Sequence, residues 1–217
     1  MVVLAAFVGL CVWGSLLYSN TLKGPFLFDD GKFILTNPAI RQLGDPVLWQ
    51  DLGHRKRFVA FFTFALNYRV HGYDVLGYHA VNIAIHLFTA LFVAWFFLLL
   101  LKTPRMKEDK IANHSYAISF LVGWLFVSHP VQTEAVTYIS QRFECLAALF
   151  YMLSLCLYLK GRMSLERPLK SAVFFIFSAV AAIAGTFTKE IVFTLPISLL
   201  LIEWIFFKGP GTEDSLT

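Results

Sequence analysis

Long apolar segments alternate with shorter polar ones along the whole chain. Six of them are about 17 to 22 residues long, near the length of helix that crosses the hydrocarbon core of a bilayer. They cover residues 1–20, 80–101, 111–128, 143–159, 171–187 and 191–207. Because backbone polar groups inside lipid must be satisfied within the segment, we expect each to be a helix. The pattern predicts an all-α polytopic membrane protein that forms a single transmembrane domain over residues 1–217.

The composition agrees with a membrane protein and argues against other classes. Hydrophobic residues make up 58% and charged residues 15% of the 217 residues, which is more apolar side chain than a soluble domain of this length can bury. The net charge of +4 comes from short basic clusters between apolar segments rather than from a continuous basic surface. We therefore expect membrane lipid around the chain and no nucleic-acid partner.

The basic clusters also predict an orientation. The short loops 102–110 and 160–170, together with Lys208, are rich in Lys and Arg, as cytoplasmic loops are. Placing them inside puts the amino terminus in the cytoplasm and the long loop 21–77 outside. The first segment has no Lys or Arg ahead of it and no small-residue cleavage pattern near Ser19, so we expect a retained anchor. The expected location is a bacterial inner membrane or the endoplasmic reticulum.

The long outer loop carries a further helical pattern. Apolar side chains recur there at near-helical spacing: Phe58, Phe61, Phe62, Ala65, Leu66 and Tyr68. Such a pattern within an otherwise polar loop predicts an amphipathic helix that lies flat on the bilayer surface.

The predicted topology gathers unusual polar side chains at the outer boundary of the membrane. They are Asp29, Asp30, Arg57, His129, Glu134, Arg142, Lys189 and Glu190. Ionised groups are costly beside lipid unless they are solvated, paired or used, so these residues are candidates for function. The plainer interpretation of the aspartate pair is a turn, because Asp and Gly are common turn residues. The plainer interpretation of the cations is a salt-bridged or snorkelling side chain.

Two helical segments are expected to turn a polar face toward a cavity or toward other helices. Four polar residues after Pro130 fall at helical spacing: Glu134, Thr137, Tyr138 and Gln141. In the second span, Tyr78 or His79 shares a face with Asn82 and His86. The two histidines could bind a metal, but no third ligand follows at helical spacing. We therefore expect a polar stripe that faces other helices, and neither a metal nor another cofactor.

Carboxylates and cations at one leaflet suit sugar transfer from a polyprenyl phosphate, whose tail stays in the membrane while its phosphate and sugar reach the surface. A carboxylate there can take the proton of an acceptor hydroxyl as the anomeric carbon becomes cationic. Arg or Lys can then stabilise the departing phosphate. If residues 26–30 are extended, Asp29 and Asp30 point to opposite faces, so only one of them is the expected base.

Two other functions fit parts of the same pattern. A non-catalytic membrane subunit could bind a lipid phosphate or a partner chain. A small proton-coupled transporter could use Glu134, His129 and Asp30, because ionisable residues inside membranes commonly mark function. Against the transporter, no two apolar segments carry the matching Gly or Pro breaks of an inverted repeat.

Short motifs between Phe26 and Ile191 resemble one known family. They are Phe26-Leu27-Phe28-Asp29-Asp30, Thr63-Phe64-Ala65-Leu66-Asn67-Tyr68, Tyr78-His79-x-x-Asn82-x-x-x-His86, His129-Pro130-Val131-Gln132-Thr133-Glu134-Ala135-Val136, Arg142-Phe143-Glu144 and Lys189-Glu190. Each motif is weak alone. In order and in spacing, they resemble the amino-terminal membrane portion of the transmembrane O-mannosyltransferases targeting cadherins and of their bacterial relatives, which carry tetratricopeptide repeats after the membrane part.

The resemblance implies a type C glycosyltransferase fold that passes a sugar, usually mannose, from a polyprenyl-phosphate donor to Ser or Thr of a protein acceptor, with inversion. It implies a catalytic aspartate in the first outer loop, with Asp29 the favoured base and Asp30 the second choice. The expected donor-phosphate contacts are Arg57, Arg142 and Lys189. The expected cavity-lining residues are His79, His86, His129, Glu134, Tyr138 and Glu190.

The chain departs from the family pattern in two motifs and in length. Arg57-Phe58 stands where the family has Arg-Pro, and residues 188–192 keep only the Lys-Glu pair of a Cys-Lys-Glu-Gln-Gly pattern. Type C folds usually have at least seven spans, whereas six are predicted here. We therefore expect a larger chain or another subunit to complete the fold.

Overall fold

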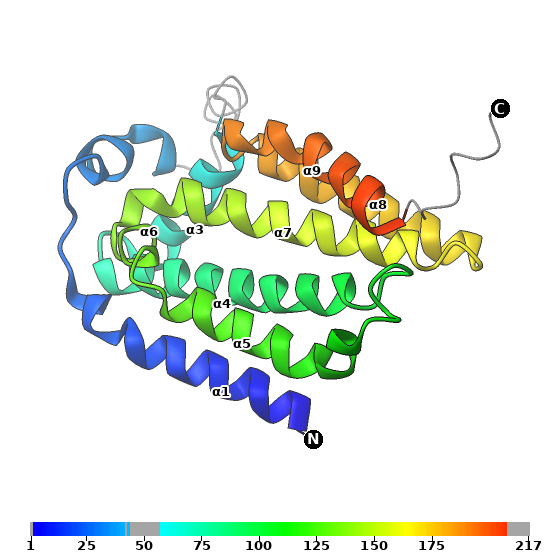
Figure 1. The fold of residues 1–217 in the computed structure, drawn as a ribbon. Coiled ribbons are helices and arrows are strands. Elements are labelled where there is room, and N and C mark those ends of the chain that lie inside the picture. The colour runs from blue at the N-terminus through cyan, green and yellow to red at the C-terminus, as the bar shows by residue number, and fades with distance from the viewer. Residues whose placement is uncertain (1, 42, 44–56, 208–217) are drawn as a thin grey trace.

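The computed structural model describes residues 2–41, 43 and 57–207, and within these ranges the chain is helical and contains no strand (Figure 1). The main helices are α1 (Val2–Leu17), α3 (Phe58–His71), α4 (Val75–Leu100), α5 (Ser115–Ser128), α6 (Gln132–Thr137), α7 (Arg142–Arg162), α8 (Pro168–Thr186) and α9 (Leu195–Ile202). Short 3-10 or π-helical pieces flank them: η1 (Ser19–Lys23), η2 (Gly31–Leu35), η3 (Pro38–Ile40), η4 (Lys110–His114), η5 (Ile139–Gln141), η6 (Glu190–Thr194) and η7 (Glu203–Phe207).

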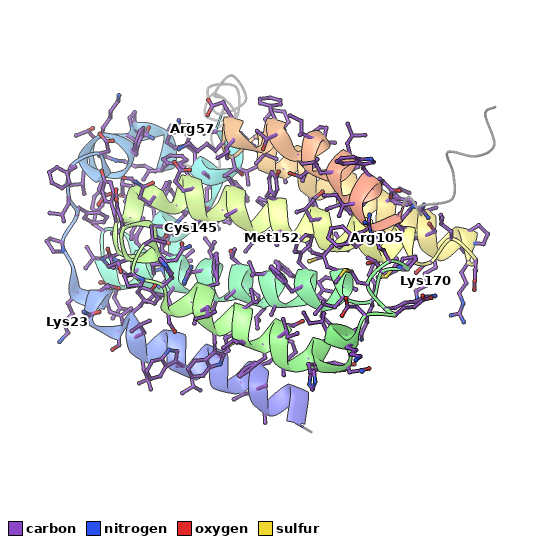
Figure 2. The ribbon with its side chains drawn as sticks, viewed as in Figure 1. Lys23, Arg57, Arg105, Cys145, Met152 and Lys170 are labelled. Atoms are coloured by element: carbon purple, nitrogen blue, oxygen red, sulfur yellow. The ribbon has the colours of Figure 1, made fainter. Side chains whose placement is uncertain are left out.

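The long helices run side by side, so the connections gather at two opposite ends of the bundle (Figure 1). We call residues 19–41, 129–141 and 187–190 the α6 end, and residues 101–110 and 160–170 the basic end. Lys23 and Arg57 lie toward the first, whereas Arg105 and Lys170 lie toward the second (Figure 2). The polar residues that the sequence analysis placed at one boundary are therefore brought to one end of the fold.

Among the described residues, five helical stretches are long and apolar enough to cross a membrane. They are Val75–Leu100, Lys110–Ser128, Ile139–Arg162, Pro168–Thr186 and Glu190–Phe207. The first predicted span corresponds to α1, a shorter apolar helix of 16 residues. The all-α polytopic architecture predicted from the sequence is confirmed, and the protein is an integral membrane protein.

The ends of the helices follow from local sequence. Asp74 begins α4, where its Oδ1 accepts a hydrogen bond from the Leu76 amide at 3.0 Å. Gly72 ends α3 with a φ of +56°, a conformation that glycine adopts without steric cost, and its amide donates to the carbonyl of Tyr68. Pro168 opens α8, where its fixed φ suits the first helical turn.

Small residues let α7 and α8 pack closely. Ser154 Oγ donates to the carbonyl of Ser178 at 2.9 Å, and Ser178 Oγ donates to the carbonyl of Ser154 at 2.8 Å. A Cβ added to Gly161 would lie 3.1 Å from the ring of Phe175, so α8 comes close to the backbone of α7 there. Within lipid, small residues and interhelical hydrogen bonds are the main sources of helix association. These contacts therefore join α7 and α8 into one unit.

Aromatic side chains seat α3 against α4 and α7. The rings of Phe61 and Phe64 meet the Phe143 ring of α7 edge to face, with centroids 5.4 and 5.6 Å apart. Phe64 also stacks on Tyr78 of α4. The helix predicted in the outer loop is present, and one of its faces packs against α4 and α7. Its buried residues are Ala60, Phe61, Phe64, Ala65 and Asn67, whereas Leu66, expected on the apolar face, is 43% exposed.

One face of α8 is left open to the surroundings of the bundle. It consists of apolar side chains at helical spacing that are 42 to 61% exposed: Val173, Ile176, Phe177, Val180 and Ile183. A soluble protein rarely exposes so continuous an apolar stripe. Lipid tails are its natural surroundings.

Candidate active site

Asp30 holds together a tight turn at the α6 end. Its carboxylate accepts hydrogen bonds from the Leu27 amide at 2.9 Å and the Ser140 amide at 2.8 Å, and the Ser140 hydroxyl donates to it as well. The side chain is only 1% exposed. Phe28, inside the turn, has a φ of +44°, which is uncommon for a residue other than glycine. Asp30 thus ties the first outer loop to the segment that leads into α7.

The carboxylate of Asp29 lies exposed beside this turn. Its backbone amide donates to Tyr138 Oη at 2.8 Å, and its carbonyl accepts from the Phe33 amide at 2.9 Å. The residue is exposed, and its carboxylate has no hydrogen-bond or ion-pair partner in the part of the chain that the structure describes. Phe28 and Asp29 form a turn, which was the plainer interpretation of the aspartate pair. The two aspartates nevertheless diverge, because one is bound inside the fold and the other is accessible.

Arg142 lies wholly inside the bundle. Its guanidinium donates to Asn82 Oδ1 at 2.7 Å, to Asn67 Oδ1 at 2.9 Å and to the carbonyl of Tyr78 at 2.9 Å. It also lies 4.4 Å from the centroid of the Phe64 ring, and the side chain is 0% exposed. These contacts join α3, α4 and α7. The expectation that Arg142 contacts a donor phosphate does not fit this geometry, because the guanidinium is enclosed by protein acceptors.

Four charged side chains meet where α8 ends and α7 begins: Arg57, Glu144, Lys189 and Glu190. We call them the charged cluster. Lys189 pairs with Glu144, and a guanidinium nitrogen of Arg57 lies 3.8 Å from Glu190 Oε2. Burial and the nearby Arg57 guanidinium lower the pKa of Lys189, while Glu190 acts in the opposite sense. Because Arg57 and Lys189 repel each other in this half-buried site, a bound anion would stabilise both cations.

The polar segment 129–141 is not one helix. α6 ends at Thr137, and Tyr138 takes an extended conformation with φ −88° and ψ 114°. Glu134, Thr137, Tyr138 and Gln141 therefore do not form the continuous polar face of one helix that their spacing predicts. The break turns the Tyr138 hydroxyl toward the turn of the first outer loop, where it fixes the backbone of the accessible aspartate.

His129 and Glu134 lie at the surface of the α6 end. Both side chains are exposed. His129 Nδ1 accepts a hydrogen bond from the Val131 amide at 3.2 Å, and Glu134 Oε1 accepts from Gln141 Nε2 at 3.3 Å. Their contacts thus lie within the segment around α6.

The polar stripe predicted on α4 faces other parts of the fold. His79, Asn82 and His86 are all buried. His79 Nε2 lies 3.0 Å from the carbonyl of Gly24, which holds the first outer loop against α4. His86 stacks on Phe126, and its Nε2 has no partner among the described residues. Within the same residues, no group of three or more His, Cys, Asp or Glu side chains could hold a metal ion.

A groove of about 480 Å³ runs along α7 from the charged cluster into the membrane-spanning part of the bundle. Its lining includes Thr89, Glu144, Ala148, Tyr151, Met152 and Thr194. A smaller cavity of about 90 Å³, lined in part by His86, Gln132 and Glu144, adjoins its polar end. Figure 2 shows Met152 midway along the bundle and Cys145 closer to the α6 end. The lining of the groove thus contains one residue of the charged cluster, Glu144, and is mainly apolar beyond it.

Two residues of this site were not assigned a role from the sequence. Ser140 binds Asp30 through both its amide and its hydroxyl. Glu144 pairs with Lys189 and lines both the groove and the smaller cavity. The available signal for Glu144 was its position as a lone acid in the first turn of an apolar helix.

The chain is similar to several known proteins. It is 33% identical to a protein O-mannosyl-transferase of Caenorhabditis elegans over 190 residues, which cover 80% of this chain and 25% of the relative. It is 31% identical to protein O-mannosyl-transferase TMTC2 of Homo sapiens over 160 residues, which cover 68% of this chain and 18% of the relative. It is 30% identical to protein O-mannosyl-transferase tmtc2 of Xenopus laevis over 213 residues, which cover 90% of this chain and 23% of the relative.

The chain thus spans about a quarter of the length of these relatives, or less. No protein-family model and no solved structure matches it. The similarity nevertheless covers most of this chain and agrees with the resemblance found from the motifs. Over most of its length, the chain is thus similar to the TMTC-type protein O-mannosyl-transferases.

Proposed function

We propose that this chain forms the membrane part of a protein O-mannosyl-transferase that moves mannose from a polyprenyl-phosphate donor to Ser or Thr of a protein acceptor. The observation that carries the proposal is the accessible Asp29 carboxylate. Tyr138 fixes its backbone at the same end of the bundle as the charged cluster. The names of the relatives, all protein O-mannosyl-transferases, support the reaction class.

In the proposed reaction, the acceptor hydroxyl attacks the anomeric carbon of mannose from the face opposite the phosphate. The new carbon–oxygen bond forms while the bond to the phosphate oxygen breaks, and its electron pair leaves with the phosphate. Asp29 takes the hydroxyl proton, and the configuration at the anomeric carbon inverts. Asp30 is a positioning residue in this scheme, because its buried carboxylate holds the turn that presents Asp29.

The charged cluster and the groove suit the two parts of such a donor. Arg57 and Lys189 supply positive charge for the departing phosphate. The apolar body of the groove along α7 suits the prenyl tail, which would then enter the bundle from the membrane. Binding of the phosphate would replace Glu144 as the partner of Lys189.

Substituting Lys189 by Gln tests this assignment. We expect a roughly ten-fold or greater rise in the KM for polyprenyl-phosphate mannose, since a charged hydrogen bond contributes about 1.5–3 kcal/mol. Lys189→Arg should retain most of the affinity. The measurement is mannose transfer to a Ser/Thr peptide by membranes that contain the full-length protein encoded by the gene.

Lys32→Gln is the matched control, because Lys32 is an exposed cation on η2 that lies outside the charged cluster. An equal effect of both substitutions, or no effect of either, would contradict a phosphate site at Lys189. Donor binding without any transfer by the unmodified protein would favour the non-catalytic subunit instead.

The proposal also requires that the Asp29 turn and the charged cluster face the same compartment, with the amino terminus in the cytoplasm. In a Cys11→Ser background, we expect Leu27→Cys and Phe187→Cys to react with a membrane-impermeant maleimide from the outer or lumenal side. These positions are 50% and 49% exposed. Lys107→Cys, at the basic end, should react only after the membrane is opened. Reaction of the first two from opposite sides would rule out the proposed active site.

A further inference from the structure

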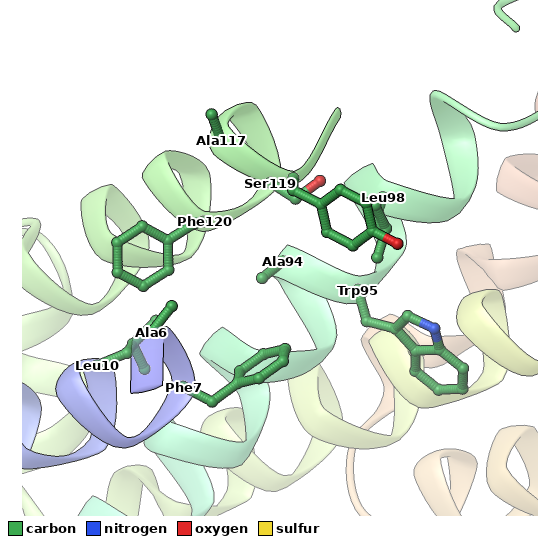
Figure 3. Close-up of a pocket in the computed structure, with 10 residues that line it drawn as sticks. Ala6, Phe7, Leu10, Ala94, Trp95, Leu98, Ala117, Ser119 and Phe120 are labelled. Atoms are coloured by element: carbon green, nitrogen blue, oxygen red, sulfur yellow. The ribbon is translucent and has the colours of Figure 1, made fainter. Parts of the chain in front are cut away.

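A second pocket lies toward the basic end, between α1, α4 and α5 (Figure 3). It has a volume of about 320 Å³, and its walls include Phe7, Leu10, Ala94, Trp95, Leu98 and Phe120. These side chains are apolar almost throughout. None of them lines the groove along α7, so the pocket is separate from the proposed donor site. Pockets of this size are large enough to hold part of a small molecule or a lipid chain.

Close packing at one level of the bundle explains where this pocket ends. A Cβ added to Gly123 of α5 would lie 3.0 Å from Ala94 Cβ on α4 and 3.1 Å from Leu10 Cδ1 on α1. The three helices therefore touch at Gly123. Toward the basic end, the next turns of α4 and α5 carry Leu98 and Tyr116, which both line the pocket.

A cation lies at the rim of this apolar pocket. Lys102 Nζ donates to Tyr116 Oη at 3.3 Å and lies 4.7 Å from the centroid of the Tyr116 ring, and Tyr116 is part of the pocket lining. Lys102 follows Leu98, another lining residue, by four positions, which is roughly 6 Å along a helix axis. The ammonium group is therefore held beside Tyr116, a residue of the pocket lining.

The loop that continues from Lys102 adds positive charge at the same end. Residues 102–110 contain four basic side chains, Lys102, Arg105, Lys107 and Lys110, and two acidic ones, Glu108 and Asp109. Of the two acids, Asp109 is engaged locally, since its Oδ1 accepts from the Ile111 amide at 2.9 Å. The surroundings of the rim thus favour an anion.

We propose that this pocket binds an acyl chain of an anionic phospholipid, with the lipid phosphate on Lys102. The apolar walls suit a hydrocarbon chain, and the ammonium at the rim suits a phosphate and a negatively charged headgroup. A zwitterionic lipid would fill the same pocket but gain less from the local positive charge. Anionic lipids are typical of the cytoplasmic leaflet, which is the side expected for basic loops. This inference does not depend on the transferase activity.

The test compares lipid retention by the full-length protein and its variants. Protein is incorporated into vesicles of phosphatidylcholine alone or mixed with phosphatidylserine, extracted in a neutral detergent, and analysed by native mass spectrometry for bound lipid. We expect the unmodified protein to retain phosphatidylserine in preference to phosphatidylcholine. Lys102→Gln should lower that retention about fivefold, the effect of one basic residue at a charged membrane surface, whereas Lys102→Arg should preserve it.

Two further variants separate the pocket from general electrostatics. Lys107→Gln removes one charge from the same loop and should lower retention of phosphatidylserine much less than Lys102→Gln does, because only Lys102 contacts the pocket residue Tyr116. Ala6→Phe, on the α1 wall, fills the pocket and should reduce retention of both lipids. The inference is overturned if Lys107→Gln acts like Lys102→Gln, or if the unmodified protein shows no preference between the two lipids. A folded Ala6→Phe protein that still retains both lipids at the unmodified level would also overturn it.

Discussion

Replacing Asp29 by Asn is expected to abolish mannose transfer while leaving the protein folded in the membrane. The Asp29 carboxylate has no partner among the described residues, and its contacts to Tyr138 and Phe33 are made by the backbone, so the substitution removes no packing. Loss of a general base typically lowers the rate by about 10²- to 10⁴-fold. The measurement is kcat for transfer from polyprenyl-phosphate mannose at saturating donor, together with the thermal stability of the purified full-length protein.

Two aspartate-to-asparagine controls sharpen this experiment. Asp74→Asn should leave both activity and stability unchanged, because Asp74 is exposed and Asn caps a helix as well as Asp does. Asp30→Asn should instead destabilise the protein by about 1–3 kcal/mol, since a buried acceptor of three hydrogen bonds loses its charge. If Asp29→Asn retains full transfer, Asp29 is not the base. If Asp30→Asn is fully stable but inactive, the roles of the two aspartates are reversed.

Replacing Arg142 by Met is expected to destabilise the protein strongly, whatever its activity. The substitution leaves the side-chain oxygens of Asn67 and Asn82 buried without their donor and empties the space beside the Phe64 ring. Removal of one member of a buried charged network typically costs about 3–5 kcal/mol. Arg142→Lys should rescue little, because one ammonium group cannot reach acceptors on α3 and α4 at once. The measurement is the Tm of the detergent-purified protein and its yield in monodisperse form.

Arg162→Gln is the control on the same helix. Arg162 lies at the opposite end of α7, where its half-buried side chain pairs with Glu203 at 2.9 Å. A partly exposed ion pair contributes about 0–1 kcal/mol, so this variant should melt close to the unmodified protein. An Arg142→Met protein with normal Tm and a raised KM for the donor would show that Arg142 binds phosphate after all.

The difference between the expected and observed position of Arg142 has a simple origin. Hydropathy alone predicts a span that begins at residue 143, which leaves Arg142 at the membrane boundary. In the structure, the guanidinium at the start of α7 is instead enclosed by acceptors of α3 and α4. Its acceptors, Asn67 and Asn82, come from two other helices. No local pattern in the sequence predicts that these two residues lie next to Arg142. Helical periodicity predicts which residues share a face, but not which faces are brought together.

In the α6 region, the local sequence pattern predicts a continuous helix that the structure does not contain. The spacing of polar residues after Pro130 is compatible with a continuous helix, and neither Gly nor Pro marks the break at Tyr138. The break is accompanied by two contacts distant in sequence, from Tyr138 to the Asp29 amide and from Ser140 to Asp30. By contrast, the gathering of Asp29, Lys189 and the α6 segment at one end of the bundle could be predicted. It depends only on the number of apolar segments between them.

The reciprocal bonds between Ser154 and Ser178 have a consequence for how the molecule assembles. No water competes for these hydroxyl groups in the hydrocarbon region, so the α7–α8 hairpin gains its partners only after both helices have entered the bilayer. Once formed, the hairpin is a cooperative unit whose opening exposes four polar groups to lipid. We therefore expect amide hydrogen exchange to be slowest in this pair, and the first outer loop to separate from it well before the two helices separate from each other.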